Sequence, residues 1–412
     1  MTIPHCRFCA SPLTEDFLDL GSQPLANSYL TPAQLAAGVE PVFPLRTRVC
    51  GDCFLVQADD PVAADAIFDD GYAYFSSYSQ SWVEHARRYA QAMTERYGLD
   101  AQSLVIEVAS NDGYLLQHFK TAGIRVLGIE PTANTAQVAI QKGIPTDVAF
   151  FNVAAGRALA ARGVAADLMA GNNVLAHVPD IADFVGGFAH VLKPQGVLSF
   201  EFPHLLNLIE QVQFDTIYHE HFSYLSLLAV ERVLRANGLR PFDVELLTTH
   251  GGSLRLFCAH EASDHQETEA LAGLRTREAK AGLGRIETYR GFTLAAERVR
   301  TGFRAFLTKA AAEGKTIAAY GAAAKGNTFL NYAGVGAADI SAVFDANPHK
   351  QDRFLPGSHI PILAPAKVAE VRPDYLLILP WNLKAEIMEQ MALIRDWGGR
   401  FVTATPEVRV FD

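Results

Sequence analysis

The densest group of chemically active side chains in this chain lies between residues 218 and 224. Tyr218, His219, Glu220, His221 and Tyr224 bring two imidazoles, one carboxylate and two phenols close together in sequence. A histidine titrates near neutral pH, a neighbouring carboxylate can orient it, and a tyrosine hydroxyl can donate to a developing oxyanion. The pattern therefore favours a proton-transfer site. The alternative interpretation is a polar loop that caps a sheet.

Four cysteines form two Cys-x-x-Cys pairs, and they are Cys6, Cys9, Cys50 and Cys53. In a reducing compartment such pairs are typical of metal ligands rather than of disulfides, although a redox motif is the alternative for a single pair. Four thiolates close a tetrahedral zinc site without an open coordination position, so we expect structural Zn²⁺. The fifth cysteine, Cys258, lies in an alternating run and is predicted to be a small core residue.

Length and charge restrict the classes of protein to which the chain can belong. Its 412 residues predict two or three domains. A net charge of −10 argues against a nucleic-acid partner, which needs a basic surface. The chain has no run of 18 apolar residues and no secretory signal, so we expect no membrane span and a cytoplasmic location. The sequence gives no indication of the oligomeric state.

A βαβ pattern begins after residue 103. The apolar run 104–108 predicts a buried parallel strand, 109–113 a turn, 114–122 a helix and 124–129 a second strand that ends at Glu130. An acidic residue at this position suits the hydroxyls of a ribose. The turn has one glycine and no G-x-G-x-x-G, so it fits an adenosyl ligand without phosphates better than a dinucleotide. An ordinary strand–helix turn is the alternative.

Further strands are predicted at 149–150, at 166–170 and at 197–202. Ligands bind beyond the carboxyl ends of parallel strands. Because Asn172, Asn173 and His177 follow the strand 166–170, we expect them to lie near a ligand. The strand 197–202 continues into the cluster at 218–224. An antiparallel strand after residue 250 is expected to end this sheet.

The C-terminal part of the chain predicts helices over 264–313 and then a second α/β unit with strands at 316–320, 340–344 and 375–381. Lys325 follows a turn of small residues at the start of a helix, where backbone N–H groups and its charge can hold a phosphate. A domain used only for packing is the alternative.

Several spaced motifs together resemble a known family. E-V-A-S-N-D-G, G-I-E-P, N-N-V-L-A-H-V-P-D and L-K-P-Q-G resemble class I S-adenosylmethionine-dependent methyltransferases. With the cysteine pairs, E-F-P-H, Y-H-E-H-F-S-Y and H-G-G-S-L-R, the chain is similar over nearly its whole length to nucleotide-sugar C-methyltransferases. These enzymes methylate the third carbon of 4-keto-deoxyhexoses. The resemblance implies an α/β fold: a four-cysteine zinc module (1–69), a class I methyltransferase Rossmann-like domain (70–262) and a second Rossmann-like domain that helps to bind the nucleotide sugar (263–412).

The resemblance also implies roles for individual residues. The implied catalytic residues are Tyr72, His177, Tyr218, Glu220 and His221. His221 is expected to remove the proton next to the ketone, with Glu220 orienting the site or supporting its charge. Tyr218, His177 and Tyr72 are candidates to steady the enolate or the sugar. His219 is the alternative base, and Tyr74 and Tyr78 are alternatives to Tyr72.

The resemblance assigns the binding residues as well. S-adenosylmethionine is expected at Glu107, Ala109, Asn111, Gly113, Glu130, Asn172 and Asn173, with the adenine near Asn152 or the two later asparagines. The nucleotide sugar is expected at His204, Tyr224, Lys325 and Asn327. An NAD-dependent oxidoreductase or dehydratase is the alternative function, but the absence of G-x-G-x-x-G and of a Tyr-x-x-x-Lys pair argues against it. A non-catalytic zinc scaffold is a third possibility. The sequence identifies neither the sugar nor the nucleotide.

Overall fold

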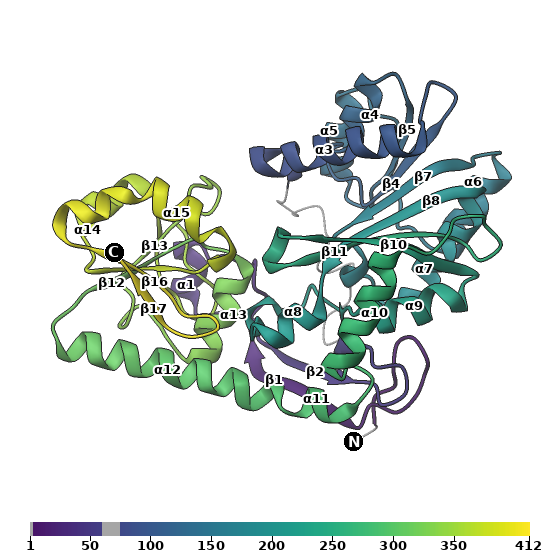
Figure 1. The fold of residues 1–412 in the computed structure, drawn as a ribbon. Helices are drawn as coiled ribbons and strands as arrows, with labels where there is room; N and C mark the ends of the chain where they lie inside the picture. The colour runs from purple at the N-terminus through teal and green to yellow at the C-terminus, as the bar shows by residue number, and fades with distance from the viewer. Residues whose placement is uncertain (1–2, 60–74) are drawn as a thin grey trace.

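A computed structural model describes residues 3–59 and 75–412. Two α/β units stand side by side, and strands of the N-terminal module lie below and between them (Figure 1). The long helix α12 (Phe292–Ala312) runs along the base of the C-terminal unit toward the N-terminal strands. None of the described helices combines the length and the apolar character needed to cross a membrane.

The N-terminal module is a small antiparallel sheet. Its elements are β1 (Glu15–Gln23), α1 (Pro32–Ala37), β2 (Phe43–Val49) and β3 (Val56–Ala58). The fourth strand is β9 (Ser223–Tyr224), which forms the end of the cluster at 218–224 and pairs with β3. The module therefore shares its sheet with the segment that carries the predicted chemistry.

A seven-stranded sheet forms the central unit, in the order β10-β11-β8-β7-β4-β5-β6. Its strands are β4 (Leu104–Val108), β5 (Arg125–Ile129), β6 (Thr146–Asp147), β7 (Ala166–Asn172), β8 (Leu192–Pro203), β10 (Leu239–Leu247) and β11 (Ser253–His260). Its α-helices are α3 (Gln80–Tyr97), α4 (Leu116–Thr121), α5 (Ala133–Gln141), α6 (Val153–Ala161), α7 (Ile181–Val191), α8 (Leu205–Glu210) and α9 (Leu227–Ala236). Every residue of β4 is buried, as expected for a parallel strand that helices cover on both faces.

Two details of this sheet differ from the sequence-based expectation. The third strand is 146–147 rather than 149–150, because Val148 and Phe150 are exposed and leave the sheet before α6. The antiparallel strand β11 does not end the sheet. It lies between β8 and β10 and pairs with both in antiparallel fashion, since β10 supplies the outer edge after α9.

The C-terminal unit contains a six-stranded sheet in the order β14-β13-β12-β15-β16-β17. Its strands are β12 (Ile317–Tyr320), β13 (Val343–Phe344), β14 (Ile362–Leu363), β15 (Tyr375–Ile378), β16 (Arg400–Thr403) and β17 (Arg409–Phe411). The remaining α-helices among the described residues are α10 (Glu269–Ala281), α11 (Ile286–Arg290), α13 (Ala324–Ala333), α14 (Val368–Val371) and α15 (Lys384–Gln390). Of these, α10 packs against β10 and α9 of the central unit. All strands except β17 are parallel, which confirms a second Rossmann-like arrangement.

The N-terminal module packs tightly on the C-terminal unit. The ring of Phe17 in β1 stacks on Phe292 at the start of α12, with centroids 4.4 Å apart and planes 5° from parallel. The module and the C-terminal unit share one buried apolar cluster. Apolar burial of this kind is the main force that holds such units together, so the module has a fixed position beside the other two units.

Candidate functional site

The four cysteines of the two Cys-x-x-Cys pairs meet in space. Their sulfur atoms all lie within 4.8 Å of one another, with 3.6 Å between the sulfurs of Cys6 and Cys53 and 3.5 Å between those of Cys9 and Cys50. A tetrahedron with zinc–sulfur bonds of about 2.3 Å has edges of about 3.8 Å. The donor set and its spacing therefore fit Zn²⁺. All four ligands come from the protein, so the ion acts as a structural element.

The turn after β4 has the backbone shape of a ligand cradle. Ala109, Asn111 and Gly113 all have positive φ, at 58°, 51° and 76°. A Cβ atom on Gly113 would lie 2.3 Å from Cδ1 of Ile144, so only glycine fits at this position without a rearrangement. The turn can thus bring its backbone close to a ligand, as the sequence predicted for an adenosyl group.

Glu130 at the end of β5 braces this turn. Its carboxylate accepts a hydrogen bond of 2.9 Å from the backbone N–H of Asn111 and another of 2.9 Å from that of Thr132. A carboxylate has about four lone-pair sites, so two further donors can still bind. The position fits the predicted ribose contact, and the two backbone bonds hold the carboxylate in place before a ligand arrives.

Several buried polar atoms around the carboxyl ends of β4 and β7 have unmet hydrogen-bonding capacity. Among the residues that the structure describes, the side-chain oxygen of Asn172 and both amide atoms of Asn173 have no hydrogen-bond partner. The carboxyl group of Glu107 is fully buried, and burial raises its pKa well above the ordinary value. A hydrogen bond with the Tyr114 side chain lowers this pKa and so opposes the effect of burial in part. Buried polar groups are costly without partners, so these atoms fit a polar ligand such as the amino-acid part of S-adenosylmethionine.

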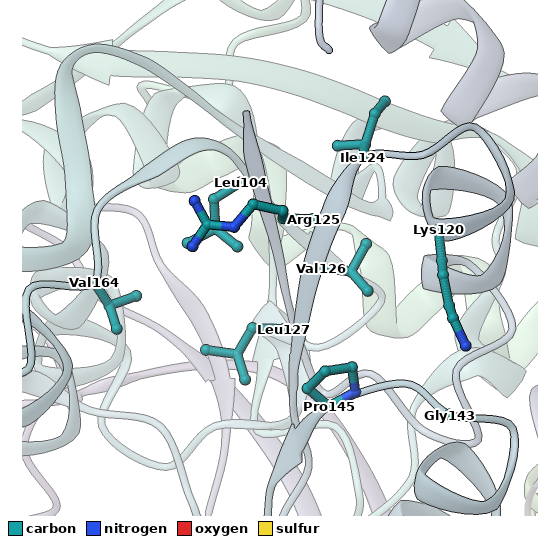
Figure 2. Close-up of a pocket in the computed structure, with 9 residues that line it drawn as sticks. All are labelled: Leu104, Lys120, Ile124, Arg125, Val126, Leu127, Gly143, Pro145 and Val164. Atoms are coloured by element: carbon teal, nitrogen blue, oxygen red, sulfur yellow. The ribbon is translucent and has the colours of Figure 1, made fainter. Parts of the chain in front are cut away.

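A surface hollow elsewhere on the central sheet is not this site. It is lined by Leu104, Lys120, Ile124, Arg125, Val126, Leu127, Gly143, Pro145 and Val164 (Figure 2). Leu104 begins β4 and Arg125 begins β5. The hollow therefore lies at the amino ends of these strands. The turn after β4 (residues 109–113) lies at their opposite, carboxyl ends.

Three aromatic side chains of the predicted catalytic set meet beyond the carboxyl ends of β7 and β8. The ring of His221 lies 4.7 Å from that of His177, centroid to centroid, and 4.0 Å from that of Tyr218. His177 ends the 3₁₀ turn η2 (Leu175–His177) after β7. Tyr218 and His221 lie in the loop between the 3₁₀ turn η3 (Phe214–Thr216) and β9. Two segments that are distant in sequence thus form one compact group.

The tautomer of His221 follows from its hydrogen bond. Nδ1 lies 3.0 Å from the backbone oxygen of Thr216, and because a carbonyl can only accept, Nδ1 carries the hydrogen. Nε2 is then the nitrogen that can accept a proton. Burial, followed by the field of His177, lowers the pKa of His221 well below its ordinary value. The imidazole is therefore neutral at physiological pH, which is the state a general base requires.

His177 is held in a similar way. Its Nδ1 lies 2.8 Å from the backbone oxygen of Glu220, to which it donates, and burial lowers its pKa to about 4. The bond links the segment after β7 to the loop between η3 and β9. The orientation of the His177 ring is therefore fixed by the same backbone that carries His221.

Glu220 and His219 face the N-terminal module. The Glu220 carboxylate accepts hydrogen bonds from Nδ2 of Asn27, at 2.8 Å and 3.0 Å to its two oxygens, and burial raises its pKa. Nε2 of His219 lies 3.3 Å and 3.2 Å from the backbone oxygens of Phe43 and Pro44. His219 is thus engaged with β2 rather than with the ring group formed by His177, Tyr218 and His221.

Near the ring group the C-terminal unit supplies Lys325, which the sequence singled out, and Trp381, which it did not. The indole N–H of Trp381 donates to a carboxylate oxygen of Asp215 at 2.7 Å. Nζ of Lys325 lies 5.0 Å from the centroid of the Trp381 ring and donates to the side-chain oxygen of Asn382 at 2.9 Å. The charge of Lys325 lowers the pKa of His250 and of His221, although burial is the largest cause for both. Lys325 therefore lies close enough to the ring group for its charge to act on it.

His250 and Trp381 could have been suspected from local sequence. His250 precedes two glycines and has a positive φ of 53°, and a Cβ atom on the neighbouring Gly251 would lie 2.4 Å from the Trp381 ring. Trp381 follows β15 at its carboxyl end. A His-Gly-Gly turn and a tryptophan after a parallel strand are the available signals. Asp215 gave no comparable signal.

Three residues predicted to bind the nucleotide sugar are buried in the structure. His204 is fully buried and pairs with Glu278 at 2.7 Å, which does not fit a contact with a diphosphate. Asn327 is fully buried, and its Nδ2 donates to the backbone oxygen of Ala26 at 2.6 Å. Tyr224 is a buried residue of β9, with its ring 6.1 Å from that of His221.

Four other residues were named as candidates or alternatives for the site. Asn152 caps α6 by accepting a hydrogen bond from the backbone N–H of Ala155, and this cap occupies its side-chain oxygen. Tyr72 and Tyr74 lie outside the described residues. Tyr78 is 69% exposed and stacks only on Phe75 among the rings of the described residues.

Comparisons with known proteins agree over the whole chain. Three family models match: a zinc binding domain over residues 6–68, a methyltransferase domain over 66–244 and a C-methyltransferase C-terminal domain over 248–406. The C-methyltransferase NovU of Streptomyces niveus is 38% identical over 408 residues, which cover 99% of this chain and 97% of that protein.

Two solved structures are similar to part of the chain. Magnesium protoporphyrin IX methyltransferase (ChlM) from Synechocystis PCC 6803 with bound SAM is 17% identical, with 48% of this chain and 89% of that chain covered and a TM-score of 0.33. The 1,6-didemethyltoxoflavin-N1-methyltransferase of Burkholderia thailandensis is 17% identical, with 52% of this chain and 97% of that chain covered and a TM-score of 0.37.

Proposed function

Since the chain belongs to the family of S-adenosylmethionine-dependent C-methyltransferases, we propose that it methylates a nucleotide-linked 4-keto-deoxyhexose on the carbon next to the ketone. In this proposal residues 1–69 bind zinc, 70–262 bind the methyl donor and 263–412 help to bind the nucleotide. The observation that carries the proposal is a neutral, buried His221 with a fixed tautomer, on which the charge of Lys325 also acts.

Methylation of carbon requires a carbon nucleophile. A hydrogen next to a ketone can be removed when a base lies near it and the enolate oxygen is stabilised. Nε2 of His221 takes this proton. The Tyr218 ring lies beside the His221 ring, and its hydroxyl is proposed to donate to the enolate oxygen. Neutral His177 donates through Nδ1 to the Glu220 backbone, so its Nε2 can only accept, and its proposed role is to hold a hydroxyl of the sugar. Tyr72 is retained as a further candidate for either role. His219 is a poorer base candidate because its Nε2 faces carbonyl groups of β2.

The methyl donor would lie against the turn after β4. S-adenosylmethionine carries its methyl group on a positively charged sulfur. A carbon nucleophile can accept this methyl group, and the sulfur then leaves as a neutral thioether. Glu107, Ala109, Asn111 and Gly113 would hold its amino-acid part, and Glu130 its ribose. Asn172 and Asn173 have the unmet hydrogen-bonding capacity that a bound cofactor would use.

The nucleotide would lie toward the C-terminal unit. Burial is the largest cause that lowers the pKa of Lys325, and the field of Asp215 opposes it, so an anion bound nearby would favour the charged amino group further. The amino group has three donors, and among the described residues it donates to one acceptor, the side-chain oxygen of Asn382. A diphosphate would supply the others.

The test follows two events in one set of reactions. A panel of nucleotide 4-keto-6-deoxy sugars is incubated with labelled S-adenosylmethionine in heavy water, and both label on carbon and loss of the hydrogen next to the ketone are measured. We expect His221→Asn to slow exchange by about 100-fold or more, since general bases contribute on this order. His219→Asn is the matched control and should exchange at nearly the normal rate. The opposite result would assign the base to His219, and exchange on no sugar would refute the proposed substrate.

A further inference from the structure

A short segment of the N-terminal module, residues 26–30, connects the C-terminal unit to the catalytic loop. The backbone oxygen of Ala26 accepts the hydrogen bond from Asn327 in α13. Leu30 pairs with Phe354 of the C-terminal unit through two backbone hydrogen bonds, of 3.0 Å and 2.9 Å. Both ends of the segment are therefore fixed to the C-terminal unit, although it belongs in sequence to the zinc module.

Asn27 projects from this fixed segment to Glu220. Its Nδ2 donates to both oxygens of the Glu220 carboxylate. Among the described residues, no other side chain donates a hydrogen bond to that carboxylate. Asn27 thus determines which rotamer of Glu220 is stabilised by a hydrogen bond.

The Glu220 carboxylate itself fixes the orientation of the Asn27 amide, because only the NH₂ group can donate to it. The Tyr29 hydroxyl lies 3.3 Å from Oδ1 of Asn27, but it gives its single hydrogen to the backbone oxygen of Ala322 at 2.6 Å. Nζ of Lys350 donates to the same backbone oxygen and lies 5.0 Å from the centroid of the Tyr29 ring. A flipped Asn27 amide would turn its oxygen toward the Glu220 carboxylate, which is repulsive. The amide group therefore has one favourable orientation.

We propose that Asn27 is a positioning residue that holds the Glu220 carboxylate in the geometry needed for proton removal. This inference rests on the proposed function and on the role that the resemblance implies for Glu220, which is to orient the site or support its charge. It makes the zinc module part of the catalytic apparatus through a hydrogen bond rather than through the metal. The Asn27 side chain itself need not touch the substrate.

A double-mutant cycle tests the inference. The variants are Asn27→Ala, Glu220→Gln and their combination, and the readout is hydrogen exchange at saturation on the keto sugar that the wild-type enzyme exchanges fastest. We expect Asn27→Ala to slow exchange by about 10-fold, at the lower end for a hydrogen bond to a charged group because the pair is partly exposed. In the Glu220→Gln background the same change should cost less than about 2-fold, since the interaction has already been weakened.

Two further measurements separate positioning from general damage. Affinity for S-adenosylhomocysteine should be the same in wild type and Asn27→Ala, because the cofactor turn is on another unit. Gln34→Ala is the matched control: it removes an exposed side chain that caps α1 in the same module without touching the loop, and it should leave exchange unchanged. An equal loss from Asn27→Ala in both backgrounds, no loss from it, or an equal loss from Gln34→Ala would each overturn the inference. Normal exchange by Glu220→Gln would instead refute the role of Glu220 in the proposed function.

Discussion

Replacement of Asp215 by asparagine should make the protein more stable at neutral pH. Burial is the largest cause that raises the pKa of this carboxyl group from its ordinary 3.8 to about 6, and the attraction of Lys325 opposes it only in part. A carboxyl group with a raised pKa in the folded state binds protons more tightly there, so the folded state loses stability as pH rises from 3.8 through 6. Above pH 6 the ionised Asp215 therefore lowers the free energy of unfolding by about 3 kcal/mol, since each unit of pKa difference corresponds to about 1.36 kcal/mol.

Asparagine removes this cost and keeps the local hydrogen bond. Its side-chain oxygen can accept the Trp381 N–H as the carboxylate does. We therefore expect Asp215→Asn to raise the free energy of unfolding at about pH 7.5 by up to about 3 kcal/mol, and by roughly half of that at about pH 5, where the wild-type group is partly protonated in the folded state.

Thermal unfolding of the two proteins at these two pH values measures the effect. The exposed Asp396 supplies a control variant, Asp396→Asn, which should unfold with the wild type at both values. A lower unfolding temperature for Asp215→Asn at the higher pH would refute the reasoning, and so would a difference from wild type that does not shrink at the lower pH. Because the change also removes a negative charge near Lys325, a nucleotide diphosphate should bind more tightly to the variant.

Three further predictions concern the metal, the cofactor turn and the nucleotide. Cys50→Ser removes one of four sulfur ligands, so metal analysis should find much less than one zinc ion per chain; a full complement would contradict the four-cysteine site. Gly113→Ala puts a Cβ atom 2.3 Å from Ile144 at positive φ, and calorimetry should show at least about 10-fold weaker binding of S-adenosylhomocysteine, whereas Gly98→Ala, also at positive φ but in open space, should bind normally. Lys325→Met should raise KM for the nucleotide sugar by about 10-fold or more with little change in kcat, and an unchanged KM would remove Lys325 from the nucleotide site.

The sequence predicted the features that depend on local pattern. The family, the α/β fold class, the zinc module and the methyl donor were confirmed. Short apolar runs such as 104–108 identify buried parallel strands because their burial on two faces leaves no alternation. The cysteine spacing identified the metal ligands because two short turns can each offer two sulfur atoms to one ion.

The features that the sequence could not predict depend on contacts between distant segments. Asn27 lies in a stretch rich in proline and alanine and meets Glu220 only because α13 and the strand pairing of Leu30 hold that stretch in place. His204 resembled a site residue in sequence, yet Glu278 of α10 pairs with it in the core. The type of a polar residue does not say whether its partner will be a ligand or another side chain.

The sheet of the N-terminal module has a consequence for the order of folding during synthesis. Strand β3 ends at residue 58, but its neighbour β9 begins at residue 223. A nascent chain that emerges from the ribosome therefore carries a sheet with an unpaired edge until β9 has been made. Such an edge is prone to pair with other chains, and contacts at this sequence separation form slowly. Zinc binding can hold the unfinished module together during that interval, which gives the metal a function before the enzyme has an active site.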